Sequence, residues 1–214
     1  GMVYLDLTGR NDWSSTLSKA NRSFFYPSAS LSFIFSEALR KATSSDLSWL
    51  TFAKIRGSYA SVGNDMGPYQ LYNTYSINKD PNGNVVASKN EVLFNSDVKS
   101  ELIHSWEVGL EAKLLDSRLN FDLAFYKSNA VNQLLNIPIN GLEGYKYKKI
   151  NAGDIENKGF ELMVNAVPVI TNDFTWDLTL NLSKNVNTVK ELAEGVTQYQ
   201  LGAFDNVHVL AAAG

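Results

Sequence analysis

The sequence contains no cysteine and only two histidines among its 214 residues. The absence of cysteine excludes disulfide scaffolds, thiolate metal sites and cysteine nucleophiles. An excess of one charge is also lacking, because 19 Lys and Arg residues face 22 Asp and Glu residues, a formal net charge of −3. This balance provides no broad basic surface for a nucleic-acid backbone. No apolar run reaches the length of about 18 residues that a transmembrane helix needs.

Short polar side chains and aromatic rings are abundant instead. Asn occurs 22 times and Ser 21 times, and aromatic residues make up 12% of the chain. This composition is typical of a β protein rich in turns. Apolar and polar residues alternate with a period of two along most of the chain, which predicts strands, and only 36–43 has a helical character. The predicted strands are 3–10, 28–36, 51–62, 104–114, 119–128, 156–167 and 174–184.

The connections between the predicted strands alternate in length from residue 63 onward. Residues 63–103 form a long polar segment, whereas 115–118 and 170–173 are tight turns. Barrels of the outer membrane have short periplasmic turns and long extracellular loops, and about 10 tilted residues cross a bilayer. Alternation alone does not separate such a barrel from a soluble β-sandwich, because a sandwich can turn its polar faces to solvent.

Five segments, in order along residues 3–192, carry the patterns of one known family. Residues 150–161 (INAGDIENKGFE) match N-x-G-x-I-x-N-K-G-x-E, and 176–192 matches its usual continuation, a Trp strand followed by N-x-S-x-N-x-N-x-V-x-x-L. The other segments are 26–30 (YPSAS), 52–64 (FAKIRGSYASVGN) and 106–126. The chain therefore resembles the barrel of SusC-like (SusC/RagA) TonB-dependent outer-membrane transporters.

The resemblance implies an all-β fold, an antiparallel up-and-down meander of about seven or eight strands that is a partial segment of a transmembrane β-barrel. Residues 1–214 would be a single segment of that barrel, with the plug domain and the remaining barrel strands outside it. It further implies a barrel-wall role in a transporter that imports oligosaccharides or other large nutrients, such as peptides. The implied partners are the TonB complex, reached through the plug, a SusD-like surface lipoprotein and the lipid of a Gram-negative outer membrane. A soluble β-sandwich that binds glycans or mediates adhesion is the alternative.

Patterns for catalysis or metal binding are scarce. Glu107 and Glu111 share a polar strand face, but four residues of strand separate them by about 13 Å, too far for either glycosidase geometry. We therefore expect no enzymatic activity, no catalytic residue, no metal site and no cofactor. Residues 80–91 (DPNGNVVASKNE) space their oxygens partly as in a calcium loop, yet Val85 stands where that loop needs glycine. An Asn-Gly hairpin tip explains the segment better.

The candidate substrate-binding residues are five tyrosines, Tyr69, Tyr72, Tyr75, Tyr145 and Tyr147. The first three recur at every third position of the long polar segment, and the last two alternate with lysines. Exposed tyrosines offer a rigid surface with a polar tip, which suits a sugar ring or a partner protein. The alternative is that the first three fold their loop onto itself and that the last two form the wet rim of a strand.

Overall fold

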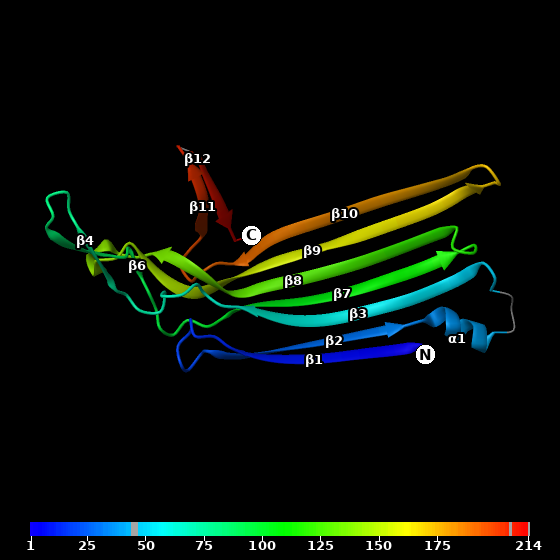
Figure 1. The fold of residues 1–214 in the computed structure, drawn as a ribbon, viewed down its shortest axis with the longest axis horizontal. Coiled ribbons are helices and arrows are strands. Elements are labelled where there is room, and N and C mark those ends of the chain that lie inside the picture. Colours follow the sequence, from blue (N-terminus) through cyan, green and yellow to red (C-terminus); the bar gives the residue numbers. More distant parts are fainter. Residues whose placement is uncertain (44–46, 206, 214) are drawn as a thin grey trace.

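A computed structural model describes residues 1–43, 47–205 and 207–213. Seven long antiparallel strands lie side by side in one sheet, and β1 and β10 form its two edges (Figure 1). The long strands, in their order across the sheet, are β1 (Val3–Trp13), β2 (Ser23–Phe33), β3 (Leu50–Asn64), β7 (Glu101–Leu114), β8 (Leu119–Pro138), β9 (Tyr147–Ile170) and β10 (Thr175–Glu191). The short β6 (Val92–Leu93) pairs in parallel with β9 and is the eighth strand. The predicted all-β meander is thereby confirmed.

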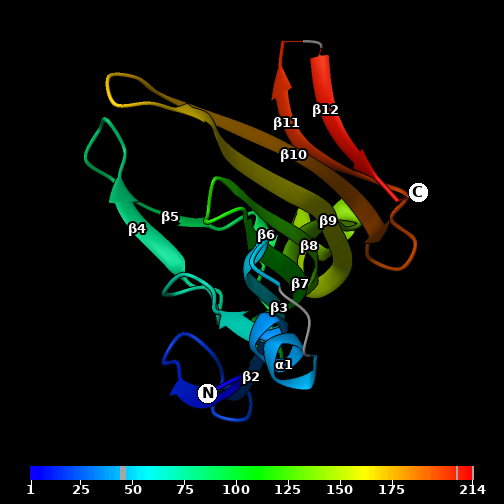
Figure 2. The same ribbon diagram turned by 90° about the vertical axis from the view of Figure 1, so that its right-hand side faces the viewer.

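The sheet is a single curved layer, and Figure 2 shows it as an open arc along which β2 and β10 lie far apart. The other sheets formed by the described residues are two hairpins, β4–β5 (Tyr75–Lys79 and Val85–Lys89) and β11–β12 (Gln198–Phe204 and Val207–Ala212). One face of the large sheet leaves its apolar side chains exposed, among them Leu5 (61%), Phe125 (50%) and Leu180 (61%). A sandwich would bury this face against a second large sheet, so the structure does not support the sandwich alternative.

Strict alternation along paired strands produces the two faces. In one row across the sheet, Leu182 pairs with Leu162, Leu162 with Leu123, and Leu123 with Leu110. The next row along the strands carries Asn181, Met163, Asp122 and Glu111 in the same order. Because successive side chains of a strand point to opposite sides, the register collects leucine on one face and polar groups on the other. We call these the apolar face and the polar face.

The two ends of the sheet differ in their connections (Figure 1). The short-turn end carries 115–118, 171–174 and, between β2 and β3, residues 34–43 with helix α1 (Phe35–Ala42) and residues 47–49. The long-connection end carries 14–22, 65–100 and 139–146. From residue 63 onward this arrangement follows the predicted rhythm, whereas the connection between β2 and β3 at the short-turn end is longer than 14–22 or 139–146. Helix α1 agrees with the helical character of 36–43. Within the described ranges, no helix has the length and apolar character that crossing a membrane requires.

Two predicted connections contain more strand than expected. The segment 63–103 is not a continuous loop, because it holds the β4–β5 hairpin and β6. The gap between 128 and 156 is mostly strand, since β8 continues to Pro138 and β9 begins at Tyr147. Positive φ angles at Asn132 (56°) and Gly153 (85°) interrupt the pairing between β8 and β9 there. The register is the same on both sides of this interruption, and the residues beyond it, 133–137 (QLLNI) and 147–151 (YKKIN), do not alternate strictly, so a search for period two misses these parts of the strands.

Small apolar cores lie at the two ends of the sheet rather than along it. At the long-connection end, Leu17, Met66 and Val98 are buried and join the connection 14–22 to the two ends of the connection 65–100. At the short-turn end, Leu50, Ala53 and Ala112 are buried beneath partly buried neighbours that include Phe35 of α1. The connections are therefore packed structures, and the middle of the apolar face is left uncovered.

Candidate functional site

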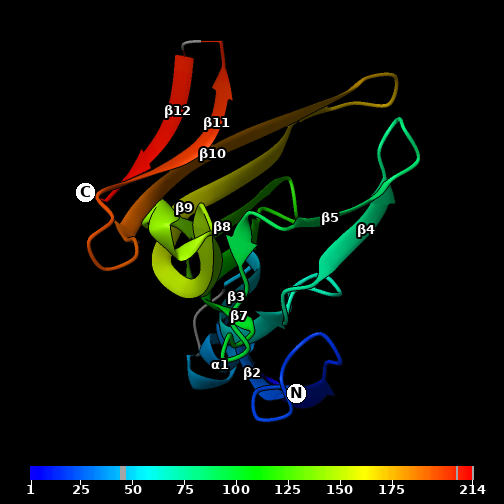
Figure 3. The ribbon, with the colours of Figure 1, turned by 90° about the vertical axis from the view of Figure 1, so that its left-hand side faces the viewer.

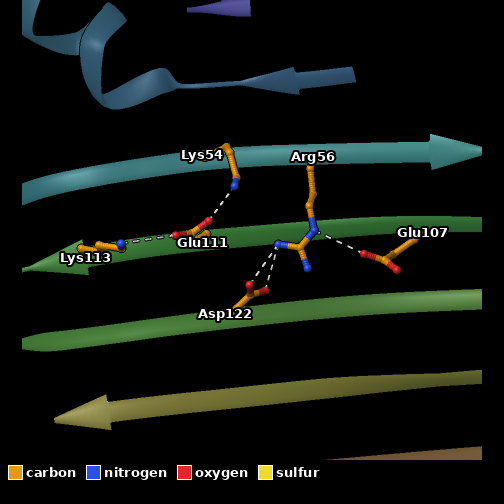
Figure 4. A network of polar contacts seen from close by, with 6 residues as sticks. All are labelled: Lys54, Arg56, Glu107, Glu111, Lys113 and Asp122. Carbon is orange, nitrogen blue, oxygen red and sulfur yellow. Dashed lines mark hydrogen bonds and ion pairs between the residues drawn. The ribbon is translucent and has the colours of Figure 1, made fainter. Parts of the chain in front are cut away.

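A network of charged side chains crosses the polar face on three adjacent strands (Figure 4). Lys54 and Arg56 extend from β3, and their acidic partners lie on β7 and β8. The Nζ atom of Lys54 is 2.6 Å from Glu111 Oε2, and the Arg56 guanidinium is 3.3 Å from Glu107 Oε1 and 2.9 Å from Asp122 Oδ1. Glu107 and Glu111 thus share the polar face as predicted, and each is held by a cation of the neighbouring strand.

The reach of Arg56 depends on a glycine in β7. Gly109 is paired directly with Arg56, and a Cβ added to it would lie only 2.5 Å from the Arg56 Cζ atom. The guanidinium therefore passes over Gly109 to meet Asp122 on β8, one strand further along (Figure 4). One side chain thereby joins β3, β7 and β8.

The charges of this network balance. Lys113 Nζ lies 3.8 Å from Glu111 Oε1, so three cations face three carboxylates. These side chains are partly exposed, and ion pairs of this kind contribute at most about 1 kcal/mol each. The network is consequently better suited to presenting a neutral, hydrogen-bonding wall than to holding the sheet together.

The long-connection end carries the five predicted tyrosines, and Lys89 links two of them. Lys89 Nζ sits 4.4 Å above the ring centre of Tyr145, a cation–π contact, and Lys89 is also paired with Tyr75 across the β4–β5 hairpin. Tyr147 pairs with Val92 of β6. Figure 3 views the molecule from this end and shows the hairpin projecting from the sheet.

The connection 139–146 is docked against the segment that follows the hairpin. The backbone amides of Lys146 and Tyr147 both donate to the Glu91 carbonyl, at 2.8 and 3.2 Å. The Lys146 ammonium also lies 2.6 Å from the Glu91 carboxylate. Tyr75 and Tyr145 are 70 positions apart in the sequence. This docking brings the connection that contains Tyr145 close to the hairpin that contains Tyr75 and Lys89.

Tyr69 and Tyr72 do not join this cluster and instead face solvent. Their exposed fractions are 94% and 64%, and Tyr69 has a positive φ of 60°. The loop around them is packed by Met66, with Leu71 lying against the same core. Self-packing by these two tyrosines is therefore not what folds the loop, and their rings are free for contact with another molecule.

A polar hollow at the long-connection end was not predicted from the sequence. It has a volume of about 590 Å³, and its lining includes Arg10, Asp12, Tyr26 and Asp65. Asp12 accepts hydrogen bonds of 2.6 Å from both Tyr26 Oη and Arg10, and Thr16 donates to Asp65 at 3.0 Å. The predicted strands stop at 10 and start at 28, whereas β1 runs to Trp13 and β2 begins at Ser23, so the register that forms this hollow was not predicted.

The carboxylate of Asp80 closes the tip of the β4–β5 hairpin. It accepts from the backbone amides of Asn82 and Asn84, at 2.9 and 2.8 Å, and from the Asn84 side chain at 3.0 Å. Gly83 has a φ of 83°, as a tight hairpin turn requires. These contacts use both oxygens of Asp80 within its own turn and support the hairpin-tip interpretation of 80–91.

We expect the order of this tip to decrease in acid. The Asn84 side chain and then the backbone amides lower the pKa of Asp80 from its ordinary value of 3.8. The stabilisation is therefore complete above pH 3.8 and is lost as the pH falls through the lower folded-state pKa. Hydrogen exchange of 80–84, corrected for intrinsic rates, should show less protection at pH 2.5 than at pH 6. Asp80→Ala should remove the difference by lowering protection at both pH values, and an unchanged wild-type profile would contradict the assignment.

The chain matches a known protein family and several of its members. The family model described as TonB dependent receptor-like, beta-barrel matches residues 2–205. TonB-dependent receptor P3 of Formosa agariphila is 29% identical over 194 residues, which cover 88% of this chain and 19% of that protein. TonB-dependent receptor SusC of Bacteroides thetaiotaomicron is 31% identical over 212 residues, covering 94% of this chain and 20% of that protein.

The fold has a counterpart among solved structures. The RagAB peptide importer in its closed-closed state superimposes with a TM-score of 0.85 and 23% sequence identity, covering 100% of this chain and 23% of that chain. At this identity the likeness concerns the fold. The chain spans about a fifth of the length of P3 and SusC. Since the family model matches residues 2–205 of 214, the chain belongs to the TonB-dependent receptor family and is part of its β-barrel.

Proposed function

We propose that the chain forms part of the barrel wall of a transporter that imports large nutrients across the outer membrane of a Gram-negative bacterium. The observation that carries this proposal is the two-faced sheet. Its apolar face leaves Leu5, Leu31 and Leu180 at least half exposed, which suits contact with lipid chains. Exposed Trp49 and Trp176 lie near the short-turn end of that face, where an aromatic girdle would meet the membrane boundary.

The polar face would line the interior of the barrel. Its charge network is neutral and partly exposed, and it offers hydrogen-bonding groups to a plug or to a passing substrate. In this orientation the short-turn end faces the periplasm and the long-connection end faces the cell exterior. Energy would come from the TonB complex through a plug domain, and a SusD-like surface lipoprotein would close the outer mouth. No nucleic acid, cofactor or covalent chemistry enters this function.

The tyrosines of the long-connection end would contact the substrate, an oligosaccharide or a peptide. Tyr75 and Tyr145 are the strongest candidates because Lys89 contacts the ring of Tyr145 and is the cross-strand partner of Tyr75. Tyr69, Tyr72 and Tyr147 are 94%, 64% and 41% exposed and would extend this contact surface. Rigid aromatic rings of this kind bind sugar faces and peptide side chains at little entropic cost.

The test is uptake by the full-length receptor, expressed in cells that lack its gene and supplied with oligosaccharides or peptides as the nutrient. We expect Tyr75→Ala combined with Tyr145→Ala to raise the half-saturating substrate concentration about tenfold, the effect of losing two moderate contact residues. Tyr4→Ala is the matched control, because Tyr4 is 50% exposed but lies towards the short-turn end. A receptor that imports neither class of nutrient, although it is folded in the outer membrane, would refute the proposed function.

A further inference from the structure

Three lysines gather on the apolar face where its apolar band ends. Lys127 of β8 is paired with Lys158 of β9, and Lys184 of β10 is paired with Phe160 in the adjacent row. All three lie on the long-connection side of the leucine row that contains Leu182 and Leu162. Three adjacent strands thus present one lysine each at the same boundary.

The lysines border a hollow whose remaining lining is mainly carbon. The hollow has a volume of about 310 Å³, and its lining includes Trp106, Phe125, Phe160 and Val186 together with the three lysines. The rings of Phe125 and Phe160 lie 6.1 Å apart and continue directly into the exposed leucines of the apolar face. A binding surface of this composition suits a molecule with an apolar chain and an anionic head.

A buried carboxylate contacts Lys127 and Lys158 without neutralising them. Glu156 is only 5% exposed, and its oxygens lie 2.8 Å from Lys127, 3.1 Å from Lys158 and 3.5 Å from Lys190. Three ammonium groups thus contact one carboxylate, an excess of two positive charges, and Lys184 lines the adjoining hollow. Asp154 of β9 and Glu191 of β10 are cross-strand neighbours in the ladder, further from the apolar band, and Asp154 accepts a hydrogen bond from Asn129 at 2.8 Å.

We propose that this surface binds a phosphate-bearing lipid of the outer leaflet of the membrane. The inference rests on the proposed function, which orients the long-connection end towards the cell exterior. The lipid phosphate would bridge Lys127, Lys158 and Lys184, and an acyl chain would lie along Phe125 and Phe160. Charge complementarity selects this occupant, because each lysine near an anionic membrane surface strengthens binding roughly fivefold.

The test is native mass spectrometry of the full-length receptor in detergent, titrated with phosphorylated lipid A and with the same lipid after enzymatic dephosphorylation. We expect the phosphorylated lipid to bind more tightly by a factor of about 100, the product of three lysine contributions. The triple variant Lys127→Gln, Lys158→Gln, Lys184→Gln should lose that preference. The matched control is Lys19→Gln, Lys79→Gln, Lys99→Gln, which removes the same charge from exposed lysines elsewhere at the long-connection end and should leave binding unchanged.

Several results would overturn the assignment. Equal binding of the two lipids, or equal loss in both triple variants, would show that the three lysines do not form a lipid-phosphate site. Complete displacement of the lipid by millimolar inorganic phosphate would indicate a site for the free anion, and a receptor dimer lost only in the first triple variant would indicate a second copy as the occupant. Heat-dependent migration of the receptor on electrophoretic gels reports barrel formation separately. A formed barrel without lipid preference refutes the lipid site alone, whereas failure to form a barrel refutes the proposed function.

Discussion

Replacement of Gly159 by valine is expected to prevent stable assembly of the barrel wall. Gly159 lies in β9 opposite Tyr126 of β8, and a Cβ added to it would lie 2.7 Å from the Tyr126 Oη atom. It would also collide with the backbone oxygen of Lys184 in β10. The tyrosine ring could swing away, but the backbone of β10 cannot move without losing its pairing with β9. We expect a loss of about 3 kcal/mol or more in the free energy of unfolding, the range of severe overpacking.

The measurement is urea unfolding of the full-length receptor in lipid vesicles, followed by tryptophan fluorescence. Gly57→Val is the matched control, because Gly57 also lies within the sheet but a Cβ there meets nothing closer than the Glu107 backbone oxygen at 3.9 Å. Combining Gly159→Val with Tyr126→Ala should restore little, since the contact with β10 remains. Full restoration by Tyr126→Ala would show that the ring alone sets the requirement for glycine, and a stable Gly159→Val variant would disprove the steric argument.

This glycine belongs to the segment that carries the family resemblance, and the structure gives several residues of that segment a physical role. Asn151 donates to the backbone oxygens of Lys99 and Asn132, so it ties β9 to the connection before β7. Gly153 provides a positive φ between two paired rows of β8 and β9, and Asn157 accepts a hydrogen bond of 2.9 Å from Asn187 on β10. The motif therefore specifies how β9 bends and pairs with its neighbours.

The faces of the strands in the central part of the sheet could be predicted from the sequence alone. Along β7 and β10 the alternation is strict, so their apolar and polar faces were predicted residue by residue, and the turn 115–118 was placed where the structure has it. Both features are local, because a period of two and a run of turn residues are visible within about ten positions. The fold class then followed from the rhythm of the connections together with the family patterns.

The features that were missed depend on register between strands distant in the sequence. Arg56 meets Asp122 at a separation of 66 positions, and it does so only because Gly109 leaves room between them. The lysine surface likewise combines single residues of three strands, and no short window of sequence contains it. The outer halves of β8 and β9 were missed because 133–137 (QLLNI) and 147–151 (YKKIN) do not alternate strictly between apolar and polar residues.

A charge placed in the middle of the apolar face is expected to be nearly as damaging as the Gly159 substitution. Leu180 of β10 is 61% exposed and is paired with Val164 of β9, within the apolar band. If this face meets lipid, Leu180→Arg should lower the free energy of unfolding in vesicles by about 2–4 kcal/mol, the cost of an arginine near the bilayer midplane. The adjacent Asn181 points to the polar face, so Asn181→Arg should cost less than about 1 kcal/mol.

The difference between these neighbouring variants is more informative than either value alone. They place the same side chain one residue apart on the same strand, so strand propensity and distance from the turn are nearly matched, and only the face differs. On a water-exposed apolar face, replacing a 61% exposed leucine by arginine would change stability by no more than about 0.5 kcal/mol. Equal effects of the two variants would therefore remove the lipid-facing assignment, and with it the basis for treating the polar face as the wall of a transport channel.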